Sequence, residues 1–319
     1  GCGRGGRRES PMRTPTRVQA AACGSVVAAS MLQSPVAGGS TVVLVPGDIS
    51  APREEMAHDA ELGCYSRWSV EALAVRLAAR LPGDSVIVLH PPRHEHGFSF
   101  WDGFVHGLDQ RTGDPVGGYD GAGTCCARVW AVLEAAERQG MDAGTPVQLL
   151  GFSKGGIVLN QVLAEFGRGS LAAEAGAPAV RLLGRMASMT WLDPGVSAQG
   201  PVLLDKHRLL KHGARAVAGA QPPPRLAVAL SSYTATAGAW RAWVPRWMQT
   251  QGGTITALRR FQRQMGRHGV VVEPELLPPR PATLETHFEL LDAFSPVWRA
   301  AIPQGGRPGR RLPESHVGG

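Results

Sequence analysis

Cysteine is scarce in this 319-residue sequence, and lysine is scarcer still. The five cysteines form no C-x-x-C pair, so neither a structural zinc site nor a disulfide framework is indicated, and a reducing compartment fits this usage best. Only three of the 33 basic residues are lysine, which we interpret as compositional bias rather than as chemistry.

Several signatures of other protein classes are also missing. No run approaches the eighteen or more apolar residues of a membrane span, and the mildly apolar stretch 18–32 is too short. The sequence has no P-loop, no G-x-G-x-x-G run with a later acidic residue, and no serine three positions before a lysine. We therefore expect no transmembrane segment, no nucleotide or other cofactor, no metal site and no S-x-x-K acyl enzyme.

The charge of the chain is unevenly distributed. The formal net charge is +7, but the excess of arginine lies before residue 41 and after residue 298. Between these ends the chain has 24 basic and 24 acidic residues. A neutral body without a basic stripe argues against nucleic acid as a partner.

The length and composition predict one main domain with distinct ends. A chain of this size with 43% hydrophobic residues can bury a sizeable core. Residues 1–40 are rich in Arg, Ala, Ser and Gly and nearly free of acid, which is typical of a transit peptide; a disordered end is the alternative. We expect a disordered or transit-peptide-like segment at 1–40, an α/β domain at 41–300 and a disordered tail at 301–319.

Short apolar runs alternate with longer segments of helical period. This pattern predicts βαβ units, and hence a mostly parallel sheet with helices on both faces. Strands are expected at 41–46, 85–90, 146–152, 185–192, 225–232 and 270–276. Helices are expected at 68–81, 125–139, 154–166, 203–218 and 239–267, with a last helix beginning near His287.

The run Gly151-Phe152-Ser153-Lys154-Gly155 has the G-x-S-x-G pattern of a nucleophile elbow. Such a turn joins a buried strand to a helix so sharply that the flanking positions have no room for a Cβ atom. Here an apolar run leads into the motif and a helical segment follows it. The pattern predicts Ser153 as the nucleophile of an α/β-hydrolase fold, with an ordinary glycine-rich turn as the alternative.

A serine nucleophile needs a general base, which this fold places after the last strand. His287 alone follows the last expected strand, at the start of the final helix. The other downstream histidines lie in expected helices or in the glycine-rich tail, at His207, His212, His268 and His316. We expect His287 to be the base, with a helix-capping or surface histidine as the alternative.

An orienting acid and an oxyanion hole would complete the site. Asp193 ends the fourth expected strand, whereas the loop after the next strand, 231–238, contains no carboxylate. Asp193 is therefore the expected acid, with an ordinary turn aspartate as the alternative. The oxyanion hole would take the backbone N–H of Lys154 and a second one from Gly47 or Asp48, where an ordinary turn fits equally well.

Two weaker patterns are explained more simply. His94 and His96 form an H-x-H pair that could bind a metal, but without an apparent third ligand a solvated loop is favoured. Trp240, Trp243 and Trp247 recur at helical spacing, which favours a buried helix face over a lid or a membrane-touching face.

The motifs above belong to a larger set of short runs. The set comprises V-P-G-D at 45–48, W-S at 68–69, D-G-F-V at 102–105, G-F-S-K-G at 151–155, V-L-N-Q at 158–161, W-L-D at 191–193 and H-F at 287–288. Together they resemble a poorly characterised eukaryotic mitochondrial family, named in vertebrates for a chromosome 2 open reading frame. The resemblance covers roughly residues 41–295.

This resemblance implies an α/β-hydrolase fold and a mitochondrial address, but it implies no established substrate. The Leu192-Asp193-Pro194 step is also similar to the acid site of the pancreatic-lipase group. Family members carry an aspartate in the loop after the following strand, where this chain reads T-A-T-A-G at 234–238. If that aspartate were the acid of the family, this chain would lack it.

These observations lead to two competing hypotheses. The first is a mitochondrial serine hydrolase that acts on a small ester or thioester through Ser153, His287 and Asp193. The second is a catalytically silent hydrolase fold that serves as a binding or regulatory protein in the mitochondrion, since function depends on sites rather than on fold. The sequence indicates neither the acyl group nor a protein partner.

Overall fold

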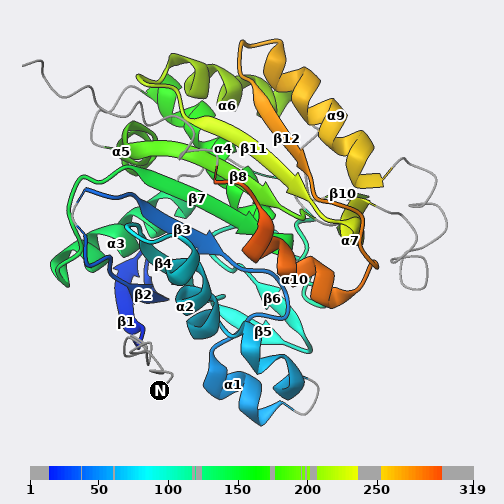
Figure 1. The fold of residues 1–319 in the computed structure, drawn as a ribbon. Coiled ribbons are helices and arrows are strands. Elements are labelled where there is room, and N and C mark those ends of the chain that lie inside the picture. Colours follow the sequence, from blue (N-terminus) through cyan, green and yellow to red (C-terminus); the bar gives the residue numbers. More distant parts are fainter. Residues whose placement is uncertain are drawn as a thin grey trace, which may run out of the picture.

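A computed structural model describes residues 14–36, 38–59, 62–116, 119, 124–172, 177–194, 196–197, 200–201, 207–235 and 253–296. Its centre is an eight-stranded sheet with the order β1-β2-β4-β3-β7-β8-β11-β12 (Figure 1). The strands are β1 (Thr16–Ala22), β2 (Ser25–Leu32), β3 (Thr41–Val45), β4 (Ser85–Leu89), β7 (Val147–Phe152), β8 (Met186–Leu192), β11 (Arg225–Leu230) and β12 (Val272–Leu276).

The strand directions identify the fold. β1 runs antiparallel to β2, and β2 runs antiparallel to β4. The remaining neighbours, from β4 through β3, β7, β8 and β11 to β12, are all parallel. This order with one reversed strand is the α/β-hydrolase fold, as predicted.

Helices cover both faces of the sheet (Figure 1). Side chains of α2 (Val70–Arg80) and α10 (Leu284–Ala293) pack with Val42 and Leu44 of β3 on one face. Val43 and Val45, which alternate with them, pack with the opposite helix layer. That layer contains α3 (Thr124–Arg138), α4 (Gly156–Ala172), α5 (Pro178–Arg185), α6 (His207–Gly219) and α9 (Gly253–Gly266).

Shorter elements surround this framework. They are α1 (Arg53–His58), η1 (Gly63–Trp68), β5 (Arg93–Glu95), β6 (Phe98–Phe100), η2 (Ser153–Gly155), β9 (Val196–Ser197), β10 (Gly200–Pro201) and α7 (Ser232–Ala235). β5 and β6 form a small antiparallel hairpin of their own. Within the described ranges, no helix is both long and apolar enough to cross a membrane.

All six strands expected from the sequence are confirmed, each with ends within two residues of the expectation. The expected helices at 68–81, 125–139 and 154–166 correspond to α2, α3 and α4. Of the segment 239–267, only α9 lies in the described part, so the tryptophans at 240, 243 and 247 lie outside it.

One expectation about the N-terminal segment is wrong. Residues 16–32, which were expected to lie in a disordered or transit-peptide-like segment, form a β1–β2 hairpin that continues the main sheet through β4. Cys23 and Gly24 turn the chain with positive φ values of 50° and 77°, the conformation that tight two-residue hairpins require. The signal was weak because the small side chains of Ala20 and Ala29 interrupt the larger buried ones of Val18, Val27 and Met31. The expectations for residues 1–13 and 301–319 fall outside the described residues.

Candidate active site

Ser153 lies at the turn between strand β7 and helix α4. Its φ of 53° is in the left-handed region, which a non-glycine residue adopts rarely and at an energetic cost. A Cβ atom at Gly155 would lie 2.1 Å from the Val45 carbonyl oxygen, and one at Gly151 would lie 3.0 Å from the Gly155 carbonyl oxygen. The turn therefore requires the two flanking glycines and leaves the Ser153 side chain only partly buried.

Asp193 occupies the equivalent position on the neighbouring strand. Phe152 of β7 pairs with Leu192 of β8, so Ser153 and Asp193 follow directly after two paired residues. Because the strands are parallel, both residues lie at the same edge of the sheet. Asp193 also has a positive φ, 44°, and its side chain is completely buried.

His287 contacts Asp193 from helix α10. Its Nδ1 lies 2.9 Å from Asp193 Oδ2, and its side chain is 5% exposed. Because an ionised carboxylate only accepts hydrogen bonds, Nδ1 is the donor, and in the neutral imidazole Nε2 is left as the acceptor. This is the tautomer that can take a proton from a serine hydroxyl.

The Asp193 carboxylate is fully hydrogen-bonded on its other sides. Its Oδ1 accepts the Ser231 backbone N–H at 2.6 Å and the Thr234 hydroxyl, and its Oδ2 accepts the Ser231 hydroxyl. These donors come from the end of β11 and from α7. The loop that lacks an acid in the sequence therefore supplies hydrogen-bond donors to Asp193.

Aromatic rings and a helix cap hold the His287 imidazole. The Phe152 ring stacks on it at 4.4 Å between centroids, and the Tyr233 ring lies at 4.6 Å. Burial raises the pKa of Tyr233 to about 12, so this neighbour stays neutral. The Thr283 side chain caps α10 by accepting the Thr286 N–H, and the Thr283 carbonyl accepts the His287 N–H at 3.1 Å.

Ser153 and His287 are linked through Phe152 rather than by a direct hydrogen bond. Phe152 immediately precedes Ser153, and its ring stacks on the His287 imidazole. Among the described residues, no hydrogen bond joins the Ser153 hydroxyl to His287. Such bonds are often long without a substrate and shorten when one binds.

The loop after β3 packs against Ser153. A Cβ atom at Gly47 would lie 2.6 Å from Ser153 Cβ, so only glycine fits here without displacement. The side chains of Asp48 and Lys154 form an ion pair, with Lys154 Nζ 2.6 Å from Asp48 Oδ1. Sequence reasoning singled out these two residues for their backbone N–H groups and missed the pairing of their side chains.

Other candidates lie away from this constellation or have different partners. Asp292, a carboxylate on the same helix as His287, binds Arg76. His94 Nε2 lies 2.5 Å from the Asp48 carbonyl oxygen, which ties it to the loop after β3. Within the described residues, no group of three or more His, Cys, Asp or Glu side chains is placed to hold a metal ion.

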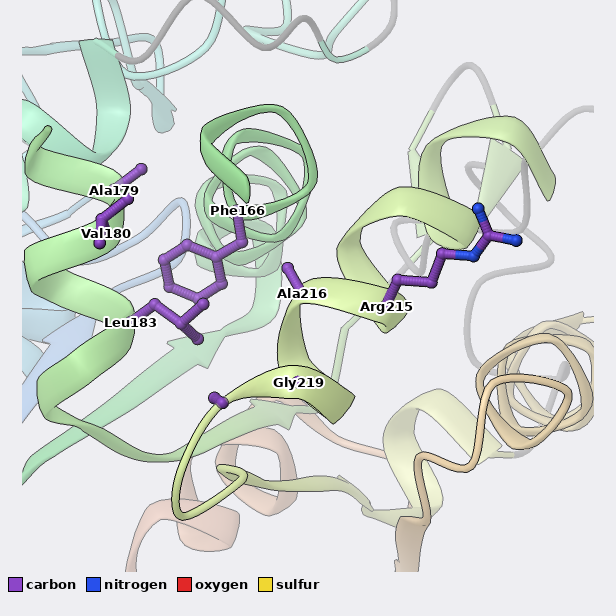
Figure 2. Close-up of a pocket in the computed structure, with 8 residues that line it drawn as sticks. Phe166, Ala179, Val180, Leu183, Arg215, Ala216 and Gly219 are labelled. Carbon is purple, nitrogen blue, oxygen red and sulfur yellow. The ribbon is translucent and has the colours of Figure 1, made fainter. Parts of the chain in front are cut away.

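A hollow lies between helices α4, α5 and α6, as Figure 2 shows. Its volume is about 250 Å³, and its lining is mostly apolar, with Phe166 from α4, Ala179 and Leu183 from α5, and Arg215 from α6. It contains no nucleophile and no acid–base pair. It therefore does not compete with the Ser153 region as a catalytic site.

Comparison with known proteins gives a family relationship. A family model described as C2orf69 matches residues 26–115 and 131–217, more than half of the chain. Ser153 and Asp193 lie inside the matched residues, and His287 lies beyond them. A zebrafish (Danio rerio) protein named "Mitochondrial protein C2orf69 homolog" is 30% identical over 173 residues. These residues are 50% of this chain and 49% of that protein, and its name supports the mitochondrial location expected from the sequence.

Solved structures of hydrolases are also similar. A dienelactone hydrolase from Anabaena variabilis aligns with 91% of this chain and 96% of its own, at 12% identity and a TM-score of 0.45. A lipase/esterase from Lactobacillus plantarum covers 83% of this chain and 89% of its own, at 13% identity and a TM-score of 0.44. The strand order and the elbow, rather than these distant likenesses, define the fold.

Proposed function

The chain belongs to the C2orf69 family, and we propose that it is a mitochondrial serine hydrolase that cleaves an ester or thioester. Ser153 is the nucleophile, His287 the general base and Asp193 the orienting acid. The observation that carries this proposal is the buried contact of Asp193 Oδ2 with His287 Nδ1 at 2.9 Å, beside a serine in a strained elbow. A carboxylate, an imidazole and a strained serine at one sheet edge are the parts that acyl transfer needs.

The first half of the reaction forms an acyl-enzyme. Ser153 Oγ attacks the carbonyl carbon of the substrate while its proton passes to His287 Nε2. The carbonyl oxygen becomes an oxyanion, which accepts hydrogen bonds from the backbone N–H groups of Lys154 and of Gly47 or Asp48. The bond to the leaving group then breaks, and the alcohol or thiol departs with the proton from His287.

The second half releases the acid. A water molecule gives a proton to His287 Nε2 as its oxygen attacks the acyl carbon. The bond to Ser153 Oγ breaks, the proton returns to Oγ, and a carboxylic acid leaves. Asp193 stabilises the imidazolium in both halves without itself taking a proton.

The rival, a catalytically silent hydrolase fold, is distinguished by covalent labelling. A fluorophosphonate probe should label the full chain at Ser153, and peptide mass spectrometry should locate the adduct. The variant Ser153→Ala should not be labelled. Ser25→Ala, which alters an exposed serine at the start of β2, should be labelled like the unchanged protein. A folded protein that the probe does not label would refute the hydrolase and favour the silent fold.

A further inference from the structure

We propose that the side chains of Lys154 and Asp48 are positioning residues that hold the oxyanion hole together. This inference rests on the proposed function. Backbone N–H groups of these two residues are the proposed oxyanion donors, one in the elbow after β7 and one in the loop after β3. Their side chains join the same two segments, so that the two donors stay at a fixed separation.

The lysine end of the ion pair is buried and has several partners, whereas the Asp48 side chain is 28% exposed. Lys154 Nζ lies 2.6 Å from Asp48 Oδ1 and 3.8 Å from Asp114 Oδ1, and it donates to the Thr112 carbonyl oxygen. The Lys154 side chain is only 7% exposed, and its ammonium lies 4.8 Å from the centre of the Phe98 ring. Lysine side chains normally extend into solvent, so this one is held in a defined conformation.

The hairpin formed by β5 and β6 holds the other end of the pair. The Ser99 backbone N–H donates to Asp48 Oδ1 at 2.9 Å, and the Ser99 hydroxyl donates to the Gly47 carbonyl at 2.9 Å. His94 Nε2 donates to the Asp48 carbonyl at 2.5 Å, because a carbonyl oxygen can only accept. Both carbonyl groups of the loop are therefore fixed by hydrogen bonds from the hairpin.

These bonds determine where the loop N–H points. In a trans peptide unit the C=O and the following N–H point in opposite directions. The bond from Ser99 to the Gly47 carbonyl therefore also fixes the Asp48 N–H, which has no acceptor among the described residues. On the other side, Lys154 is the second residue of a helical segment, where N–H groups lack partners within the helix. Both proposed donors are thus available to a ligand.

The charges of the pair depend on each other. Burial raises the pKa of Asp48, and the Lys154 ammonium opposes that shift. Because the two side chains are bonded to each other, we expect neither of them to contact the reacting atoms of the substrate. Their contribution is to keep the loop and the elbow in register, and a misplacement of about 1 Å can lower turnover about 10²-fold.

The test compares single and double variants of the full chain. Lys154→Met removes the ammonium but leaves the Asp48 carboxylate without its partner, which can destabilise the fold. Lys154→Met combined with Asp48→Asn removes both charges and keeps an oxygen for the Ser99 N–H. For each protein we would measure the fluorophosphonate labelling rate, kcat and KM for p-nitrophenyl butyrate, and Tm. Arg185→Met, which breaks the enclosed Arg185–Glu137 pair at the opposite sheet edge, is the matched control.

The expected result separates stability from catalysis. The double variant should recover most of the Tm lost by Lys154→Met. Its kcat and labelling rate should nevertheless stay about 10²-fold below those of the unchanged protein, while its KM changes less than about threefold. Arg185→Met should lower Tm and leave kcat unchanged. A double variant that regains both Tm and kcat would show a merely structural pair and overturn this inference alone. A wild-type protein that neither reacts with the probe nor hydrolyses the ester would overturn the hydrolase proposal, and this inference with it.

Discussion

The Asp193 carboxylate and the His287 imidazole lie 2.9 Å apart, although they are separated by 94 positions in the sequence. Asp193 directly follows strand β8, and His287 lies in the first turn of α10, the last described helix. Such a contact between buried polar groups orients the imidazole, and the proposed chemistry depends on that orientation.

Replacing Asp193 by Asn should lower turnover about 10⁴-fold, because an amide favours the wrong tautomer of His287 while keeping the shape. The measurement is kcat for p-nitrophenyl butyrate, with circular dichroism to establish that the variant is folded. Asp292→Asn is the control, because Asp292 lies on the same helix as His287 but pairs with Arg76. Equal losses in the two variants would contradict the assignment of Asp193.

Ser153→Ala and His287→Ala should each lower turnover about as much as the double variant does. Residues that share one proton transfer act as a unit, so the second substitution removes little that the first has left. Turnover of the two single variants and the double variant under the same conditions tests this. If the two losses multiply in the double variant, Ser153 and His287 do not share a step.

Gly155→Ala should destabilise the protein by about 1–3 kcal/mol, the usual range for overpacking a close-packed interior. The added Cβ would meet the Val45 carbonyl oxygen at 2.1 Å, and backbone cannot move aside as a flexible side chain can. Gly184→Ala is the matched control, because nothing lies within 4 Å of its added Cβ in helix α5. There alanine should be neutral or stabilise by up to about 1 kcal/mol. Urea unfolding of both variants measures the difference.

His90 should make the protein less stable as the pH falls from 7 to 5. Burial lowers its pKa to about 4 from the ordinary 6.5, so in this interval the unfolded chain takes up a proton that the folded protein does not. Linkage gives a loss of about 2 kcal/mol at pH 5, and none is expected above pH 7.

The matched variant for this effect is His90→Gln, which keeps a polar group beside the Ser30 hydroxyl, now 2.9 Å from His90 Nε2. Urea unfolding at pH 7 and at pH 5 gives the free energy of unfolding of both proteins. The loss between the two pH values should be about 2 kcal/mol smaller in the variant. A variant with the same pH dependence as the unchanged protein would show that His90 is not responsible.

The β1–β2 hairpin should be required for folding. A chain that starts at Thr14 keeps every described contact, whereas one that starts at Gln33 loses the buried side chains of Val18, Val27 and Met31 and exposes the edge of β4. Each such side chain contributes about 1.5–3 kcal/mol, and an open strand edge favours aggregation. Limited proteolysis and urea unfolding should show a stable first chain and an unstable second. Equal stability would refute the structural role of the hairpin.

The sequence by itself determined the parts of this protein that depend on local patterns. Strands β3, β4, β7, β8 and β11 were predicted because strands buried on both faces read as nearly continuous apolar runs. Ser153 was predicted because the elbow needs glycines at fixed neighbouring positions. The β1–β2 hairpin was not predicted because the small side chains of Ala20 and Ala29 interrupt its larger buried residues, and the segment was interpreted from its biased composition instead.

Only the tertiary structure decided which distant residues meet. Elimination selected Asp193, but Ser231 and Thr234 could be recognised as its hydrogen-bond donors only once β8 and β11 were placed side by side. The Lys154–Asp48 ion pair could not be predicted from the sequence, because nothing in the sequence indicates that these two distant charged residues meet in the fold. Burial, hydrogen-bond direction and charge pairing depend on how the strand ends converge, and that convergence is a property of the whole sheet.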